Sequence, residues 1–389
     1  MKKYILFLFL SIPFLSGAQH TISGIVLDKD ALIPLDGVHL YLKHAQKGTI
    51  SNNQGEYQFT IDTTNITDTL CFSYLGYATV IKPLHNSSNL KDTIHLKPTS
   101  LLLAEMRVSA NPLSAKEILE KAIENYDNNY LPINYKGTLK HAAYIENKLN
   151  RLLLSELVFV KKRKNVRLYK NKEKQYVKIK QEDNQFVGYV YLTNLMQLIH
   201  IKDQLIKYSK KLDLRDTSLD ISVSPNYYGT NQVYEINLNK DMEKGQFRKI
   251  KLIIDKTSFA LIELAFDVTL GTDYETKIVM IDSLSMEFPA MIPIFTGVIR
   301  FKPFEKKWMF SDLKAIAALE VIENKKITKK VKHVLLFTAN QLNIKKPKKG
   351  LRLNLQGNIF KQIDSLTPAS NFKEISLNKK ELEFIKTKL

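Results

Sequence analysis

The sequence predicts a mainly β protein with two domains: an N-terminal seven-stranded β-sandwich and a C-terminal antiparallel β-meander with a few helices. Two observations predict this fold class. Seven short strand patterns separated by turn residues lie between residues 20 and 97, and alternating apolar residues recur from about residue 133 onward. A half-barrel is an alternative form of the second sheet. The single cysteine excludes a fold held together by intramolecular disulfides.

The first eighteen residues are typical of an export signal. Lys2 and Lys3 precede an apolar run over residues 4–15, and the small residues 16–18 then precede Gln19. The run is shorter than the ~20 apolar residues that a spanning helix needs. We therefore predict a signal peptide over 1–18 and an exported protein that is periplasmic or associated with the outer membrane. We expect no transmembrane helix in the mature chain.

The first domain is predicted over residues 19–98. Residues 52–55 (Asn-Asn-Gln-Gly) are turn formers that tolerate positive φ. Val38, Leu40 and Leu42 alternate with His39, which we therefore expect on a solvated face of the sheet, as we do His95. The expected strands are 20–27, 37–43, 48–51, 55–61, 68–74, 76–82 and 92–97.

This segment resembles a known family through a run of ordered glycines and aromatic residues. Its pattern is G-x-V-x-D, P-L-x-G-V-x-L-Y-L-K, G-T-x-S-N-x-x-G-x-Y-x-F and D-T-L-x-F-S-Y-L-G-Y. The pattern resembles the carboxypeptidase regulatory-like domain, which is found at the N-terminus of TonB-dependent receptors and related exported proteins of unassigned function. The resemblance implies a prealbumin-like β-sandwich and a non-catalytic appendage, not a zinc peptidase. Residues 30–33 (Asp-Ala-Leu-Ile) depart from it because they are more apolar than the polar turn expected there.

A linker is predicted over residues 99–113, including one further strand in the sequence LLLAEMRVSA. Ser114 and Glu117 then form an S-x-x-E capping box, which predicts a helix over 114–126. Two further helices are expected in the C-terminal domain, 114–389. One lies near 194–208, and the other lies near 378–388.

The C-terminal domain also carries a second resemblance, based mainly on alternating strand patterns. It resembles the region that follows this N-terminal module in exported proteins, and the half-open sheet of periplasmic lipoprotein carriers. A half-open sheet would offer an apolar concave face to an acyl chain. Alternatively, the helices close the sheet over its own core. The residues behind the resemblance are Tyr234, Ile236, Ile254, Asp255, Ala260, Phe301, Lys307 and Trp308.

The sequence contains no recognisable set of catalytic or metal-binding residues. No two of the eight histidines have H-x-H or H-x-x-x-H spacing, and G-x-S-x-G, phosphate-loop and G-x-G-x-x-G motifs are absent. Cys71 lies in an apolar strand, where a buried and inert thiol is expected. We predict no enzymatic activity, no catalytic, cofactor-binding or metal-binding residues, and no cofactor.

The chain is strongly basic, which favours anionic partners. Its formal charge of +19 becomes +17 once Lys2 and Lys3 are removed. Export makes nucleic acid unsuitable as a partner, so an envelope protein or an anionic lipid surface is expected. Residues 161–180 hold ten basic residues and one acid, and they either form a solubilising face or contact an anionic surface. The candidate contacts are Lys161, Lys162, Arg163, Lys164, Arg167 and Lys170.

Together, these patterns predict a non-enzymatic exported envelope protein that acts as an interaction or structural module. The alternative is a periplasmic lipid or lipoprotein-binding carrier that uses an apolar concavity of the C-terminal domain.

Overall fold

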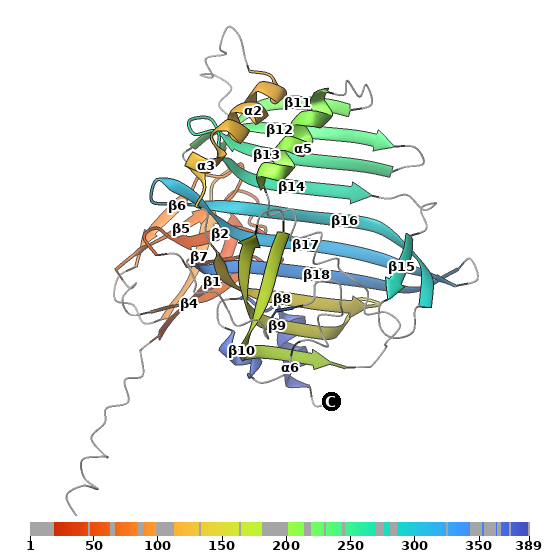
Figure 1. The fold of residues 1–389 in the computed structure, drawn as a ribbon. Helices are drawn as coiled ribbons and strands as arrows, with labels where there is room; N and C mark the ends of the chain where they lie inside the picture. Colours follow the sequence, from red (N-terminus) through yellow and green to blue (C-terminus); the bar gives the residue numbers. More distant parts are fainter. Residues whose placement is uncertain are drawn as a thin grey trace, which may run out of the picture.

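The computed structural model shows two β-domains in contact, a small sandwich and a broad curved sheet (Figure 1). The predicted signal peptide lies outside the described residues, as do 99–112 of the predicted linker. The structure describes residues 19–45, 47–62, 67–84, 89–98, 113–131, 134–162, 165–180, 201–213, 219–228, 231–242, 246–269, 276–280, 286–323, 326–342, 352–353, 363, 367–372 and 375–387.

The N-terminal domain is the predicted seven-stranded sandwich. Its two sheets have the strand orders β4-β1-β7 and β3-β2-β5-β6, and only the β1–β7 pairing is parallel among the pairs described here. Val38, Leu40 and Leu42 point into the core between the sheets, as their alternation predicts. Cys71 is buried. The strands are β1 (Gln19–Asp28), β2 (His39–Leu42), β3 (Gly48–Ile50), β4 (Glu56–Asp62), β5 (Thr69–Ser73), β6 (Val80–Pro83) and β7 (Asn89–Leu96).

The apolar turn that departs from the family pattern is an exposed loop held by hydrogen bonds to Asp28. Asp28 Oδ1 accepts hydrogen bonds of 2.7 Å from the backbone N–H groups of Asp30 and Ala31, and the Tyr77 hydroxyl donates to Asp28 Oδ2 over 2.6 Å. These bonds fix the loop so that Leu32 and Ile33 face solvent, with 63% and 56% of their surfaces exposed.

The C-terminal domain is built on one antiparallel sheet of eleven strands. Its order is β10-β9-β8-β18-β17-β16-β14-β13-β12-β11, and β15 pairs with β16. Neighbours in this order are mostly consecutive in the chain, which confirms the predicted meander, whereas β8 and β18 pair across a large sequence separation. The strands are β8 (Tyr135–Ile145), β9 (Lys148–Lys162), β10 (Asn165–Ile179), β11 (Leu219–Tyr228), β12 (Asn231–Met242), β13 (Gln246–Asp255), β14 (Leu261–Thr269), β15 (Thr276–Met280), β16 (Met286–Phe304), β17 (Lys307–Glu323) and β18 (Lys326–Leu342).

The helices agree with the capping signals in the sequence. The chain forms α2 (Ala115–Glu124), α3 (Tyr126–Asn129), α5 (Ile201–Asp213), a 3-10 turn η6 (Ala369–Asn371) and α6 (Lys379–Lys386). The predicted capping box at Ser114 starts α2, and a second capping box, between Asn378 and Glu381, starts α6. The helix expected near 194–208 is described from Ile201 and continues to Asp213.

The sheet is covered on both faces. Helices α2 and α5 lie across β11–β14 (Figure 1), and their apolar residues share one core with strands as far apart as β10 and β12. On the opposite face, Phe384 of α6 packs with Leu152 and Leu154 of β9. Because both faces are covered, residues 261–264 are all buried and do not alternate between buried and exposed.

The prediction that His39 lies on a solvated face is wrong. Its side chain is only 1% exposed because the outer face of β2 packs against the large sheet, where His39 Nε2 lies 2.5 Å from Ser311 Oγ of β17. His95, on β7, is exposed as expected.

Candidate functional site

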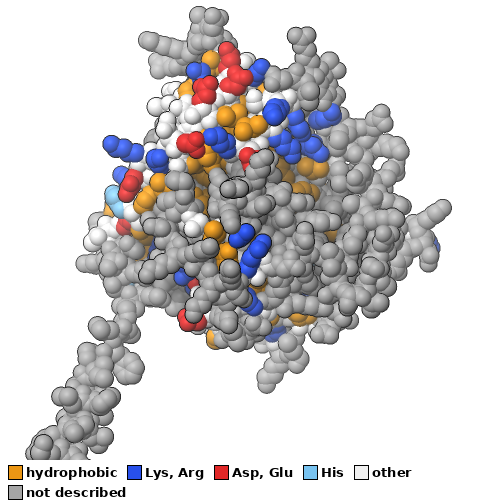
Figure 2. Space-filling view, viewed as in Figure 1, with side chains coloured by type: hydrophobic (Ala, Val, Ile, Leu, Met, Phe, Trp, Pro, Cys, Tyr) orange, Lys and Arg blue, Asp and Glu red, His pale blue; other side chains and the backbone are white. Residues whose placement is uncertain are grey.

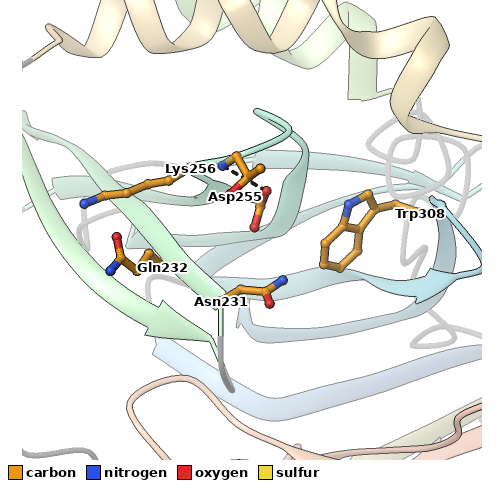
Figure 3. Close-up of a pocket in the computed structure, with 6 residues that line it drawn as sticks. Asn231, Gln232, Asp255, Lys256 and Trp308 are labelled. Carbon is orange, nitrogen blue, oxygen red and sulfur yellow. Dashed lines mark hydrogen bonds between the residues drawn. The ribbon is translucent and has the colours of Figure 1, made fainter.

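An open polar cleft of about 510 Å³ lies at one end of the large sheet (Figure 3). Three chain segments meet there: the start of β12, the β13–β14 turn and the start of β17. The described lining residues are Asn231, Gln232, Asp255, Lys256, Thr257 and Trp308.

Asp255 builds the turn on one side of this cleft. Its Oδ1 accepts hydrogen bonds from the backbone N–H groups of Thr257 (3.1 Å) and Ser258 (2.7 Å), and from the Ser258 hydroxyl (2.8 Å). An Asp side chain that bonds to the backbone two and three residues ahead stabilises a tight turn. The backbone N–H of Lys256 also donates to the Gln232 carbonyl over 3.0 Å, which joins the turn to β12.

Trp308, the only tryptophan in the chain, forms the opposite side of the cleft. It opens β17 opposite Pro303 and forms a backbone bridge to Tyr130. The side chain belongs to the main core and is 8% exposed, so it presents only a small part of the indole to the cleft. In Figure 3 the carboxamide of Asn231 points toward this ring.

The described lining carries one carboxylate and one ammonium group, so its formal charges cancel. The Lys256 ammonium lies 5.2 Å from the centre of the Tyr234 ring, a cation–π contact. The two exposed carboxamides, of Asn231 and Gln232, each offer both hydrogen-bond donors and an acceptor. This arrangement is suited to binding a polar molecule.

The described residues of the cleft do not form a set for proton transfer or metal binding. Among the described residues, the lining includes neither a histidine nor a cysteine, and Asp255 is its only carboxylate. Over the whole described part of the chain, no group of three or more His, Cys, Asp or Glu side chains could hold a metal ion.

A protein-family model described as CarboxypepD_reg-like domain matches residues 22–108. The N-terminal sandwich is a CarboxypepD_reg-like domain. The match confirms the predicted resemblance, and it continues beyond Pro98 into the segment that was predicted to be a linker. No curated protein sequence matches the chain.

Solved structures that align with the chain share little sequence with it. A LolA superfamily protein from Nitrosomonas europaea is 9% identical, with 62% of this chain and 99% of that chain covered and a TM-score of 0.22. A putative outer membrane lipoprotein-sorting protein domain from Vibrio parahaemolyticus is 8% identical, with 62% and 97% covered and a TM-score of 0.26. Pseudomonas aeruginosa MucB, solved in complex with MucA, is 6% identical, with 58% and 93% covered and a TM-score of 0.18. Such low TM-scores do not establish a shared fold.

The CarboxypepD_reg-like domain docks on the large sheet over a buried charge cluster and through one partly exposed ion pair, neither of which the sequence predicted. Arg300 of β16 contacts Glu263 (3.0 Å) and Asp312 (3.1 Å), and its guanidinium lies beneath Gly37 of the domain. Asp36 of the domain pairs with Lys314 over 2.6 Å. Alternation along β16 and β17 could have placed the charged residues on one face, but it could not have identified what covers that face.

Burial and charge set the proton affinities at this interface. Burial lowers the pKa of Arg300, but the carboxylates of Asp312 and Glu263 more than offset it, so the net shift is upward. Burial lowers the pKa of Lys302 to about 8. Burial also raises the pKa of Asp312, although Arg300 opposes that shift. The interface therefore keeps Arg300 charged between two carboxylates.

A second buried polar group lies on the face of the sheet that carries the main core, next to Leu335. His141 Nε2 of β8 and His333 Nδ1 of β18 are 3.1 Å apart. Burial and the nearby charge of Arg151 lower the pKa of His333 to about 4, and burial, His333 and Arg151 lower that of His141 well below 6.5. Spacing within the sequence cannot reveal this pair, because its members lie 192 positions apart on neighbouring strands.

The predicted anionic-surface residues lie on the β9–β10 hairpin, except for Arg163 and Lys164, which are outside the described residues. The side chains of residues 161–162 are likewise not described. Arg167 and Lys170 are half-buried, and residues three apart on a strand face opposite sides. These two therefore do not share one face, and contact with an anionic surface stays a prediction.

Basic residues also gather over α5 on the face shown in Figure 2. Lys207 and Lys210 of this helix are exposed, whereas Lys202 pairs with Asp127 over 2.9 Å. None of the described helices is both long enough and apolar enough to span a membrane.

Proposed function

We propose that this protein is an exported, non-enzymatic component of the cell envelope that acts as an interaction module, in the periplasm or at the outer membrane. Its CarboxypepD_reg-like domain and large sheet form one docked unit, and the polar cleft beside Trp308 is the binding surface. The formal charge of the chain favours an envelope protein or an anionic lipid surface among its partners.

The observation that carries this proposal is the contrast between an apolar face whose described residues pack into one core and an open polar cleft. Ile118 of α2 and Leu205 of α5 are fully buried against the sheet, in the same core as Leu157 of β9 and Leu252 of β13. A carrier of acyl chains needs a concave site lined mainly by apolar side chains. The described cleft is instead lined by carboxamides, charged groups and one indole.

A non-enzymatic role also agrees with the chemistry of the cleft. Asp255 Oδ1 already accepts three hydrogen bonds from its own turn, which fixes the carboxylate as a structural group. A general base needs a neighbouring nucleophile or water within hydrogen-bond reach and a suitable pKa. The described lining supplies polar contacts for binding without such a pair.

Two measurements on the full chain test this function. In the first, a fluorescent fatty acid is titrated into the protein, and we expect no saturable binding because the described residues of the apolar face pack against one another. In the second, a photo-crosslinking amino acid replaces Gln232 in the cleft or, as the matched control, Gln54 in an exposed turn of the sandwich. We expect a crosslink to an envelope component when the photo-crosslinking amino acid is at position 232, and none when it is at position 54. Saturable one-to-one binding of the fatty acid would instead make the protein a lipid or lipoprotein-binding carrier.

A further inference from the structure

We propose that the cleft beside Trp308 binds an uncharged oligosaccharide. This inference rests on the proposed function and names the ligand class of the same cleft. The volume of about 510 Å³ lies within the roughly 300–1,000 Å³ of typical small-molecule sites.

The charge balance of the cleft selects against ions. Asp255 and Lys256 are its charged lining residues in the described chain, and their formal charges cancel. The turn occupies one oxygen of Asp255, and the Lys256 ammonium rests on the Tyr234 ring. Neither group is left as an isolated charge that would hold a carboxylate or a phosphate. The cleft therefore favours a ligand that is polar but carries no net charge.

The carboxamides supply the recognition chemistry. Asn231 and Gln232 are consecutive, exposed and at the start of β12, and each presents an acceptor oxygen and an NH₂ donor. A sugar hydroxyl both donates and accepts, so adjacent hydroxyls can bond to both ends of one carboxamide. An aliphatic ligand would leave these amides unpaired, which costs binding energy.

Trp308 supplies an apolar contact beside these amides. The C–H faces of a sugar ring are apolar, whereas its hydroxyls point outward, so a sugar has the mixed character of this cleft. The indole sits at the cleft wall and the Asn231 carboxamide points toward it (Figure 3). Its low exposure, 8%, restricts the contact to a small part of the ring and predicts modest affinity.

The only tryptophan of the chain gives a direct assay. Its fluorescence should change saturably when the full chain is titrated with at least one of chitotriose, cellotriose and maltotriose, up to 10 mM. The dipeptide Gly-Gly and glucuronic acid test the zwitterionic and anionic ligand classes. We expect Asn231→Ala and Gln232→Ala each to weaken the binding by about tenfold, which corresponds to one lost hydrogen bond.

Gln54→Ala is the matched control, because it removes an exposed carboxamide from the sandwich, and it should bind as tightly as the unchanged protein. Equal thermal unfolding of the three variants shows that the fold is intact. The inference is overturned if none of the three sugars gives a saturable change, if Gly-Gly or glucuronic acid binds more tightly, or if the cleft variants bind like the control. Those results leave the interaction module in place, because fatty-acid binding and crosslinking at position 232 test it separately.

Discussion

Lowering the pH from 7 to 4.5 should destabilise the protein through its buried histidines. His333 is fully buried on the apolar face of the sheet, and its pKa is lowered to about 4 from an ordinary 6.5. The unfolded chain binds a proton at this position below pH 6.5, whereas the folded chain does not bind it until the pH approaches 4. The stabilisation is therefore complete above pH 6.5 and is lost as the pH falls toward 4.

The magnitude follows from the shift of the pKa. A difference of about 2.5 pH units at about 1.4 kcal/mol per unit amounts to about 3.5 kcal/mol for His333 alone, of which about 2.5 kcal/mol is lost between pH 7 and 4.5. The pKa values of His39 and His141 are also lowered well below 6.5 by burial, so both act in the same direction. Because total stabilities of domains are about 5–15 kcal/mol, this loss is easily measured.

The assay is urea unfolding of the full chain at several pH values between 7 and 4.5. The slope of unfolding free energy against pH counts the protons that unfolding takes up. His333→Asn should reduce this slope by up to one proton, about 1.4 kcal/mol per pH unit. His95→Asn, at an exposed position on β7, is the control substitution. Equal slopes for the His333 variant and the unchanged protein would show that His333 is not held neutral by burial.

Four further predictions concern the interface, a helix cap, the sandwich and the basic hairpin. Gly37→Ala should destabilise the chain by about 1–2 kcal/mol in urea unfolding, because Gly37 has a φ of +78° and its added Cβ would lie 3.1 Å from Arg300; no loss would contradict the observed docking. Asn378→Ala should cost about 1 kcal/mol by the same measurement, because it removes the cap of α6. The segment 19–98 should fold alone, because it has its own core, but unfold at a lower temperature than in the full chain; a disordered amide spectrum would show that the large sheet completes it. Changing residues 161–164 to Gln should weaken co-sedimentation with anionic vesicles in 0.1 M salt, unless these residues only solubilise the surface.

The local features of this fold could be predicted because they depend on residues that are close together in the sequence. The Asn52–Gly55 turn and the alternation of Val38, Leu40 and Leu42 depend on contacts within a few positions or across one hairpin. The cap at Ser114 is likewise a local hydrogen bond, and the spacing of its capping box predicts it.

Contacts between distant segments could not be predicted in the same way. Strand alternation predicts a solvated His39, because it shows which residues share a face of the sheet but not what covers that face. Its partner, Ser311, is 272 positions away. The pairing of β8 with β18 has the same character, and it brings His141 and His333 together without any motif in the chain.

The cleft was only partly visible in the sequence. The strand patterns include Asp255 and Trp308, but no pattern in the sequence singles out Asn231 or Gln232. These residues become neighbours only when the β13–β14 turn and the starts of β12 and β17 meet at one end of the sheet. A turn-forming Asp followed by Thr and Ser was a usable signal for the turn, but nothing in the sequence gave its partner across the cleft.

The deciding measurement is native mass spectrometry of the full chain, purified from the cell envelope without denaturation. It shows whether the protein is an interaction module or carries a bound lipid. We expect the mass of the polypeptide alone or with a polar ligand that Gln232→Ala removes. A stoichiometric lipid or acylated peptide that survives purification and is unaffected by Gln232→Ala would contradict it.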